Sequence, residues 1–193
     1  MKKKFELTSE FITNCFGTKL FRIRALKNFG SVKKWDLGGF VEKEANIDQS
    51  GDAWVYGNAE VYGNAKVSGN AWVSGNARVY GNARVYGNAE VYGNAWVYGN
   101  AEVYGNAWVY GNAEVSGDWD YATVKGFGRY WRNTTFYRGQ DKKTHVVCGC
   151  FRGDLEAFRK QVKETHGDNK YAREHLMIAD LMEMHFKEGD NGK

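Results

Sequence analysis

Gly51-Asp52-Ala53-Trp54-Val55-Tyr56 is the first of eleven consecutive copies of one six-residue repeat, and the last copy ends at Ser116. The other ten copies all begin Gly-Asn-Ala, continue with a variable residue and a valine, and end in tyrosine or serine. A fixed period over about a third of the chain predicts a repeat architecture, in which each unit packs against its neighbours. So few side-chain types leave little room for an active site inside the repeats.

Each repeat has the alternation of a short β-strand. The alanine and the valine lie two residues apart, so on a strand they share one face, which is small and apolar and should point inward. The variable residue and the final tyrosine or serine share the outer face. Glycine and asparagine tolerate positive φ and fall where the chain must turn. Short strands joined by tight corners predict a coiling parallel β-helix.

This pattern resembles the hexapeptide-repeat, left-handed β-helix superfamily, in which three hexads make one triangular coil. The resemblance covers Gly51–Ser116, with a degenerate twelfth hexad at residues 117–122. It implies a mainly β fold of about four to five triangular coils. Left-handed coiling is implied by the resemblance alone, because ordinary parallel crossovers are right-handed.

Three hexads per coil stack residues eighteen apart and predict three flat faces with different outer side chains. The first face carries Trp54, Trp72, Glu90 and Trp108, beside Tyr56, Ser74, Tyr92 and Tyr110. The second carries Glu60, Arg78, Trp96 and Glu114, and the third carries Lys66, Arg84, Glu102 and Asp120. At the corners asparagine should stack on asparagine, with amide hydrogen bonds between coils.

The segments on either side of the repeats are expected to cover the ends of the β-helix, because exposed strand edges invite aggregation. Residues 1–50 predict an N-terminal β-hairpin, within residues 5–28, and a capping coil. Residues 51–122 form the repeat domain. Residues 123–193 predict a C-terminal strand at Thr144–Phe151 and two α-helices. The first helix begins after Asp154 and ends at Gly167, and the second runs from about Asp168 or Asn169 to Lys187.

Asp36–Glu42, the Gly-Asn-Ala array and Cys148-Gly149-Cys150-Phe151 before two helices also resemble a group of small phage and prophage proteins. This second resemblance implies a viral origin and assigns no active site.

Charge and cysteine content exclude several classes of protein. The net charge is +4, and residues 51–116 hold three basic and five acidic side chains, which disfavours a polybasic binder of duplex nucleic acid. Tryptophan and arginine interrupt the acidic positions, which disfavours mimicry of DNA. The three cysteines have neither CxxC nor zinc-ligand spacing, which indicates free thiols in a reducing compartment and no metal or cofactor. No apolar run is long enough to span a membrane, and no signal-peptide core follows Met1, so we expect a cytoplasmic protein in a bacterial host cell.

The superfamily resemblance raises an enzymatic hypothesis, because its acyltransferases use a histidine base on a coil and its carbonic anhydrases use three histidine ligands. Acyl transfer needs a base within hydrogen-bond reach of the substrate. Residues 51–122 contain no histidine and no cysteine. The four histidines are all C-terminal: His145, His166, His175 and His185. We therefore expect a non-enzymatic protein, with an acyltransferase-like enzyme or a purely structural scaffold as the alternatives.

The outer aromatic residues favour a binding surface, because tryptophan and tyrosine are enriched at interface hot spots and rarely lie bare in contiguous patches. A homo-oligomer, preferably a trimer as the superfamily implies, is the first hypothesis, and recognition of another macromolecule or a carbohydrate follows. The candidate interface residues are Trp54, Trp72, Trp108, Tyr56, Tyr92, Tyr110 and Trp96. Alternatively, the tyrosines are simply favoured on flat strands.

A basic and aromatic stretch follows the repeats, from Lys125 to Lys143. Guanidinium groups bind phosphate and aromatic rings stack on bases, so this stretch is the candidate site for a nucleotide or another anion. The candidate residues are Arg129, Tyr130, Trp131, Arg132 and Arg138. With the phage resemblance, the hypothesis is a protein that blocks a host defence macromolecule or sequesters its nucleotide signal. The competing interpretation is an exposed basic strand near a cap.

Overall fold

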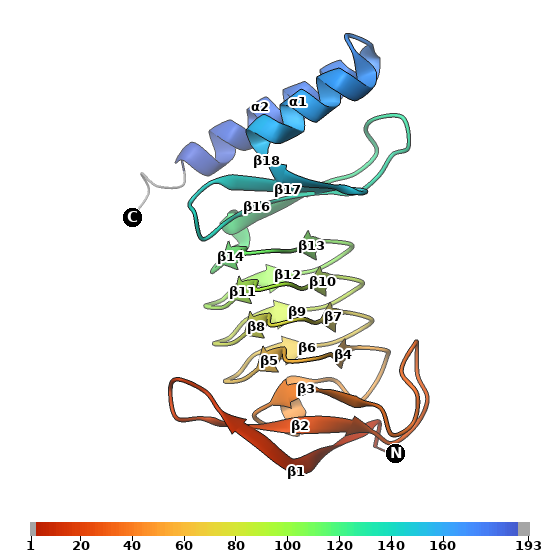
Figure 1. The fold of residues 1–193 in the computed structure, drawn as a ribbon, viewed down its shortest axis with the longest axis vertical. Coiled ribbons are helices and arrows are strands. Elements are labelled where there is room, and N and C mark those ends of the chain that lie inside the picture. The colour runs from red at the N-terminus through yellow and green to blue at the C-terminus, as the bar shows by residue number, and fades with distance from the viewer. Residues whose placement is uncertain (1–2, 189–193) are drawn as a thin grey trace.

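A computed structural model describes residues 3–188. It is an elongated stack with a β-solenoid in the middle, a sheet of longer strands at the N-terminal end, and a second sheet with two helices at the C-terminal end (Figure 1). The largest purely solenoidal sheet contains four stacked strands, so the solenoid has about four turns. The predicted parallel β-solenoid with an N-terminal hairpin and two C-terminal helices is confirmed.

The solenoid strands are two residues long, and each consists of the variable residue and the valine of one hexad. They are β4 (Trp54–Val55), β5 (Glu60–Val61), β6 (Lys66–Val67), β7 (Trp72–Val73), β8 (Arg78–Val79), β9 (Arg84–Val85), β10 (Glu90–Val91), β11 (Trp96–Val97), β12 (Glu102–Val103), β13 (Trp108–Val109) and β14 (Glu114–Val115). Parallel pairing joins residues eighteen apart, as in Trp54 with Trp72. The three predicted faces are therefore three parallel sheets, β4-β7-β10-β13, β5-β8-β11-β14 and β6-β9-β12.

The interior is filled by the alanines and valines of the repeat, all of them at most 1% exposed. Backbone hydrogen bonds link successive coils, as from the Trp72 amide to the Ala89 carbonyl at 2.9 Å. At the corners, only the glycine of each Gly-Asn pair has positive φ, between +61° and +80°. The asparagines instead form amide hydrogen bonds between coils, such as Asn70 to Asn88 at 3.1 Å and Asn88 to Asn106 at 3.2 Å.

The N-terminal sheet continues one face of the solenoid. β1 (Phe5–Thr13) and β2 (Lys19–Ala25) form the predicted hairpin, and β3 (Leu37–Val41) pairs antiparallel with β2 and parallel with β5. The short 3₁₀-helix η1 (Glu44–Asn46) turns the chain toward Ile47, which forms a bridge with Val67. The segment before the first hexad therefore completes an initial coil beneath the repeats.

The burial of Trp54 corrects the expected outward exposure of the whole tryptophan column. Its side chain is 0% exposed, because Phe5 and Phe29 of the N-terminal segment pack edge-to-face against the indole. Lys4 is also fully buried here, and its ammonium donates to the Ala53 carbonyl at 3.0 Å and lies 5.1 Å from the Phe29 ring centroid.

The twelfth hexad does not continue the repeat, in contrast to the prediction. Residues 118–120 form the 3₁₀-helix η2 (Asp118–Asp120), and β15 (Tyr121–Val124) leaves the solenoid. Asp120, expected on the outer face, is 5% exposed, whereas Trp119 is 56% exposed. The reason is local: Asp120 Oδ2 accepts hydrogen bonds from the Ser116 and Gly117 amides and the Ser116 hydroxyl, which turns the chain over the end of the last coil.

A four-stranded antiparallel sheet covers the end of the solenoid, where the sequence predicted one strand. Its order is β15-β16-β17-β18, with β16 (Thr134–Arg138), β17 (Thr144–Cys148) and β18 (Phe151–Asp154). Gly149, at φ +59°, breaks the predicted single strand Thr144–Phe151 into a tight hairpin. Cys148 therefore ends one strand and Cys150 lies in the turn, so the two thiols do not share a strand face.

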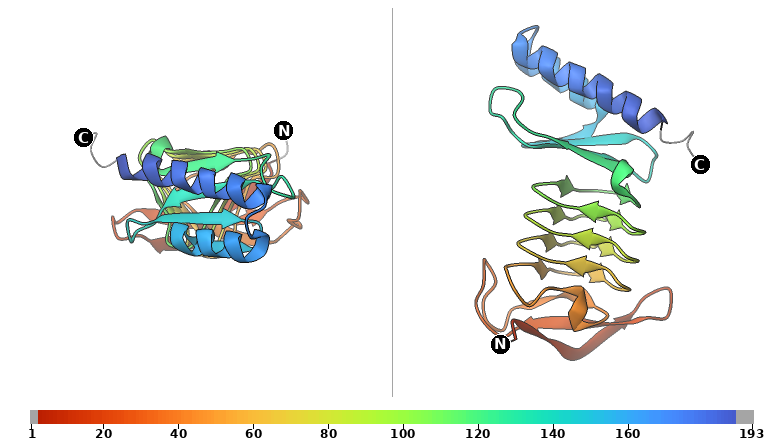
Figure 2. Two further views of the ribbon diagram at one scale, coloured as in Figure 1. Left: turned by 90° about the horizontal axis from the view of Figure 1, so that it is seen from above. Right: turned by 180° about the vertical axis from the view of Figure 1, so that it is seen from behind.

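Alternate residues of this sheet face two different cores. Tyr137 and Val147 pack with the solenoid interior, while Phe136 and Val146 pack beneath the helices. The helices α1 (Leu155–His166) and α2 (Lys170–Glu188) lie on the side of the sheet away from the solenoid (Figure 2). Asp154 accepts from the Ala157 amide as the predicted N-cap, at 2.9 Å, and α1 ends at Gly167 as expected.

Candidate functional site

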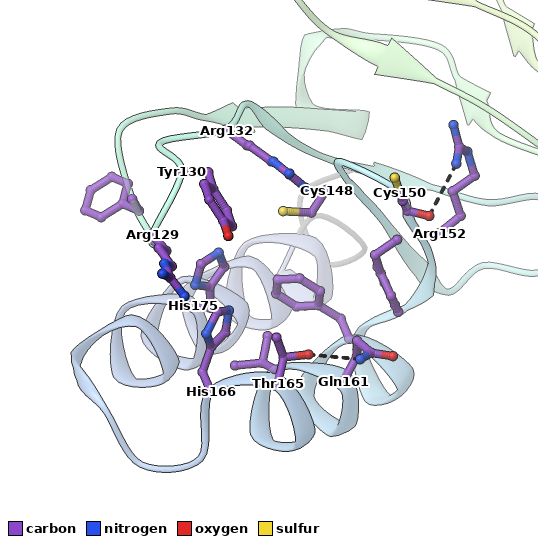
Figure 3. A pocket seen from close by; sticks show the side chains of 15 residues that line it. Arg129, Tyr130, Arg132, Cys148, Cys150, Arg152, Gln161, Thr165, His166 and His175 are labelled. Atoms are coloured by element: carbon purple, nitrogen blue, oxygen red, sulfur yellow. Dashed lines mark hydrogen bonds between the residues drawn. The ribbon is translucent and has the colours of Figure 1, made fainter.

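A concave site lies in the C-terminal module, beyond the last coil of the solenoid. It is a cavity of about 600 Å³ between residues 127–132, the turn that joins β17 to β18, and one end of the helix pair (Figure 3). Cavities of this size are typical of small-molecule sites. Its lining combines aromatic, cationic and thiol side chains, and it includes no aspartate or glutamate among the described residues.

One wall is the loop between β15 and β16, which is fixed against α2. Gly126 and Gly128 have φ of +94° and +72°, and the Gly128 amide donates to the Glu174 carboxylate at 2.9 Å. A Cβ atom at Gly128 would lie 2.2 Å from Cε1 of His175, so only glycine allows this close approach. The loop thereby presents Arg129, Tyr130 and Arg132 to the cavity.

The two arginines of this loop lie around one exposed ring. The guanidinium carbons of Arg129 and Arg132 lie 5.6 Å and 4.9 Å from the Tyr130 ring centroid. None of the ion pairs found within residues 3–188 neutralises either guanidinium. Two cations at the rim of a cavity without lining carboxylates make it attractive to an anion.

Arg152 lines the same cavity, and two tyrosines of the solenoid fix the position of its side chain. Its guanidinium donates to the Tyr92 hydroxyl at 3.1 Å and lies 5.2 Å from the Tyr110 ring centroid. Hydrogen bonding to Tyr92 raises the Arg152 pKa, so this side chain is a permanent cation. Tyr92 and Tyr110, which were predicted as interface residues, thus contact the C-terminal module through Arg152.

Two of the five predicted anion-binding residues do not line the cavity. Trp131 is 71% exposed, has φ of +49°, and is not among the residues that line the cavity. Arg138 lies on another side of the module, where it pairs with Asp120 at 3.4 Å and donates to the Phe186 carbonyl at 2.9 Å. Its position indicates a role in joining the last coil to the C-terminal sheet.

The thiol and imidazole groups of this site were not predicted from the sequence. Cys148 and His175 both line the cavity, and His166 stacks on His175 with ring centroids 5.9 Å apart. Burial tends to raise the Cys148 pKa, but the polar influence of the His175 and Thr134 side chains outweighs it, and the net pKa is lowered. The Cys148 hydrogen bond, opposed by burial, raises the His175 pKa. The feature of the sequence that could have indicated His175 is its position between Ala172 and Ala179, on the buried stripe of α2.

The predicted interface aromatics do not form one open patch. Trp54 is buried, Trp72 is 38% exposed, and Trp108 is half-buried on the same sheet. Tyr56 packs edge-to-face on Trp72 and bonds the Ser31 hydroxyl. Trp96 lies on a different sheet, where Arg78 covers it at 5.8 Å from the ring centroid.

Residues 3–188 contain neither a cluster of metal ligands nor a membrane-spanning helix. Within residues 3–188, no three His, Cys, Asp or Glu side chains gather closely enough to hold a metal ion. The same part of the chain has no helix with the length and apolar character needed to cross a membrane.

Comparison with known proteins identifies the repeat. A family model described as the YdcK beta-solenoid repeat matches five overlapping stretches, residues 59–75, 71–87, 77–93, 83–99 and 95–111. No curated protein matches the chain. The matched stretches lie within the solenoid and end before the cavity, so the chain is similar to this family in its β-solenoid coils.

Proposed function

We propose that this protein is a binding protein whose C-terminal module holds an anionic ligand that carries a planar ring, of the nucleotide class. One observation carries the proposal: Arg129, Arg132 and Arg152 meet at one aromatic-lined cavity with no acidic side chain among its described lining residues. The solenoid serves as a rigid base, since its small-residue core and continuous hydrogen bonds leave it little freedom.

The chemistry of the cavity suits a phosphate joined to a ring. Guanidinium groups bind phosphate oxygens through paired, charge-assisted hydrogen bonds. Tyr130 is 62% exposed and already has Arg129 and Arg132 near its ring, so a planar base can replace one guanidinium as the stacking partner. The released guanidinium is then free to bind the phosphate.

A binding assay with paired variants tests this proposal. Isothermal titration with a panel of mono-, di- and cyclic nucleotides should detect a ligand for the wild-type chain. Arg129→Gln combined with Arg132→Gln should weaken that binding at least tenfold, because each charge-assisted contact contributes about 1.5–3 kcal/mol. The matched control is Lys125→Gln with Lys160→Gln, which removes the same charge from residues outside the cavity lining. Equal loss in both variants, or no binding by the wild type, contradicts the proposal.

The sequence resemblances are the basis of our proposal for the origin and the cellular role of this protein. The Gly-Asn-Ala repeat supports membership of the left-handed hexapeptide superfamily, and the flanking motifs support a phage protein that acts in the host cytoplasm. In that setting the basic cavity favours sequestration of a host nucleotide signal over blockade of a host macromolecule. Mass spectrometry of nucleotides released from protein purified out of phage-infected cells tests this role, and the absence of any bound nucleotide would contradict it.

Self-association is a second candidate, favoured by the exposure of Trp72. This residue and Trp108 lie on the sheet β4-β7-β10-β13, and neighbouring copies in a trimer could cover them. Native mass spectrometry at micromolar concentration should show a trimer, and Trp72→Ala should shift it to smaller species. Arg84→Ala, on the sheet β6-β9-β12, is the control. A wild-type protein that stays monomeric overturns this candidate.

A further inference from the structure

A thiol and an imidazole lie together in the cavity and have no part in anion binding. Cys148 is at the end of β17, and His175 is on α2, only 9% exposed. The Thr134 hydroxyl donates to Cys148 Sγ at 3.2 Å, and the His175 side chain lines the same cavity as this thiol. Figure 3 shows both side chains directed into the cavity.

The backbone of α2 fixes which nitrogen of His175 is able to accept a proton. His175 Nδ1 lies 2.7 Å from the Tyr171 carbonyl oxygen, which can only accept, so Nδ1 carries a proton. Nε2 is then left for Cys148, as the acceptor of the thiol proton. A nucleophile beside a base that a third group orients is the arrangement that activates cysteine in enzymes.

The surroundings favour the ionised pair. Arg132 adds positive charge near Cys148, and Glu174 adds negative charge near His175, while His166 stacks on the imidazole. Although burial opposes both charges, the pKa of Cys148 is lowered and that of His175 is raised. The Cys148 thiol is thus more acidic than an ordinary cysteine and borders an open cavity, and both features favour reactivity.

We infer that Cys148 is a nucleophilic thiol, activated by His175, which reacts with small disulfides that carry negative charge. In the reaction, the Cys148 thiolate attacks one sulfur of the disulfide R–S–S–R. A Cys148–S bond forms as the S–S bond breaks, and the second sulfur leaves as R–S⁻. That thiolate takes the proton held by the His175 imidazolium, so the products are the mixed disulfide on Cys148 and one R–SH.

The preference for an anionic disulfide follows from Arg132, whose guanidinium lies at the Gly149 turn next to Cys148. A Cβ atom placed on Gly149 would lie 2.3 Å from Nη1 of Arg132. A carboxylate on the incoming disulfide can therefore meet a cation beside the reacting sulfur. This inference does not require the nucleotide proposal, because it concerns the sulfur and its base.

The test compares single-cysteine forms of the full chain. One form keeps Cys148 (Cys15→Ser, Cys150→Ser), and the other keeps the exposed Cys15 (Cys148→Ser, Cys150→Ser). Each reacts with dithiobis(nitrobenzoate), an anionic aromatic disulfide, and with neutral dithiodipyridine, from about pH 5 to pH 9. At pH 6, Cys148 should react about tenfold faster than Cys15 with the anionic probe, and its rate should level off at lower pH.

Two further variants distinguish activation of the thiol by His175 from attraction of the anionic probe by Arg132. In the Cys148 form, His175→Gln should abolish the rate advantage and restore the pH dependence of an ordinary thiol. Arg132→Gln should instead lower only the preference for the anionic probe over the neutral one, by about threefold or more. If the His175→Gln variant does not fold, the pH dependence of the reaction rate of the Cys148 form alone tests whether this thiol is activated. Equal or slower reaction of Cys148 than of Cys15 with both probes, at every pH, overturns the inference.

Discussion

The indole of Trp54 packs edge-to-face against the ring of Phe5, with ring centroids 5.9 Å apart and an angle of 74° between the planes. The periodicity assigns Trp54 to the outer face, and its pairing with Trp72 shows that it occupies the expected repeat position. The N-terminal segment covers this position, and therefore an outer-face residue of the first repeat belongs to the core.

Replacement of Trp54 by alanine should destabilise the protein far more than replacement of Trp72, its pairing partner in the next coil. Trp54→Ala removes a fully buried side chain and should lower the free energy of unfolding by about 3–5 kcal/mol. Trp72→Ala is the matched control, because it has the same repeat position but is 38% exposed, and should lower it by about 1 kcal/mol or less. Urea unfolding followed by circular dichroism measures both. Similar losses would contradict the assignment of Trp54 to the cap interface.

The coils could be predicted from sequence because each hexad meets nearly the same neighbours. Ala and Val lie inside and asparagine stacks at the corners in successive coils, so a local pattern determines a local environment. The prediction failed at the two ends, where segments distant in sequence meet. Phe5 covers Trp54 and Asp120 turns back on Ser116, and neither contact follows from the period.

The corner glycines offer a test of how tightly the coils stack. Gly87 and Gly105 have nearly equal φ, +72° and +69°. A Cβ atom at Gly87 would lie 3.0 Å from the Gly105 amide nitrogen, whereas one at Gly105 would meet nothing within 4 Å. Gly105→Ala should cost only the left-handed backbone strain, about 1 kcal/mol. Gly87→Ala should cost clearly more, about 2–3 kcal/mol, since the coils must also move apart. Thermal unfolding that ranks Gly105→Ala as the worse variant would contradict this stacking.

Asp120 should be the main polar contact that holds the C-terminal sheet to the solenoid. Asp120→Ala leaves Arg138 without this carboxylate and three donors of Ser116 and Gly117 without their acceptor, so we expect a loss of about 3 kcal/mol. Asp118→Ala is the control, because this exposed carboxylate accepts one bond, from the Glu102 amide, and should cost about 1 kcal/mol. Hydrogen exchange should show early opening of β15 and β16 in the Asp120 variant. Unchanged exchange there would contradict the proposed role.

The candidate site was only partly predictable. A basic and aromatic composition was enough to select Arg129, Tyr130 and Arg132, because these residues come from one loop. Arg138 lies on the adjacent strand β16 and so reaches another side of the module, which composition cannot reveal. Cys148 and His175 are 27 residues apart, counted as 175 minus 148, and only the packing of α2 on the sheet brings them together.

The buried Lys4 gives the N-terminal cap a distinctive dependence on pH. Burial lowers the pKa of Lys4 to about 8 from 10.5, with smaller opposing effects of Asp48 and Asp52. Between these two values the unfolded chain binds more protons than the folded chain, so stability must rise with pH through this window. From pH 8 to pH 9.5, which is below tyrosine ionisation, the free energy of unfolding should increase by about 1–2 kcal/mol relative to Lys4→Met. Urea unfolding of both proteins at the two pH values measures this difference. A constant difference would show that Lys4 keeps an ordinary pKa in the folded protein.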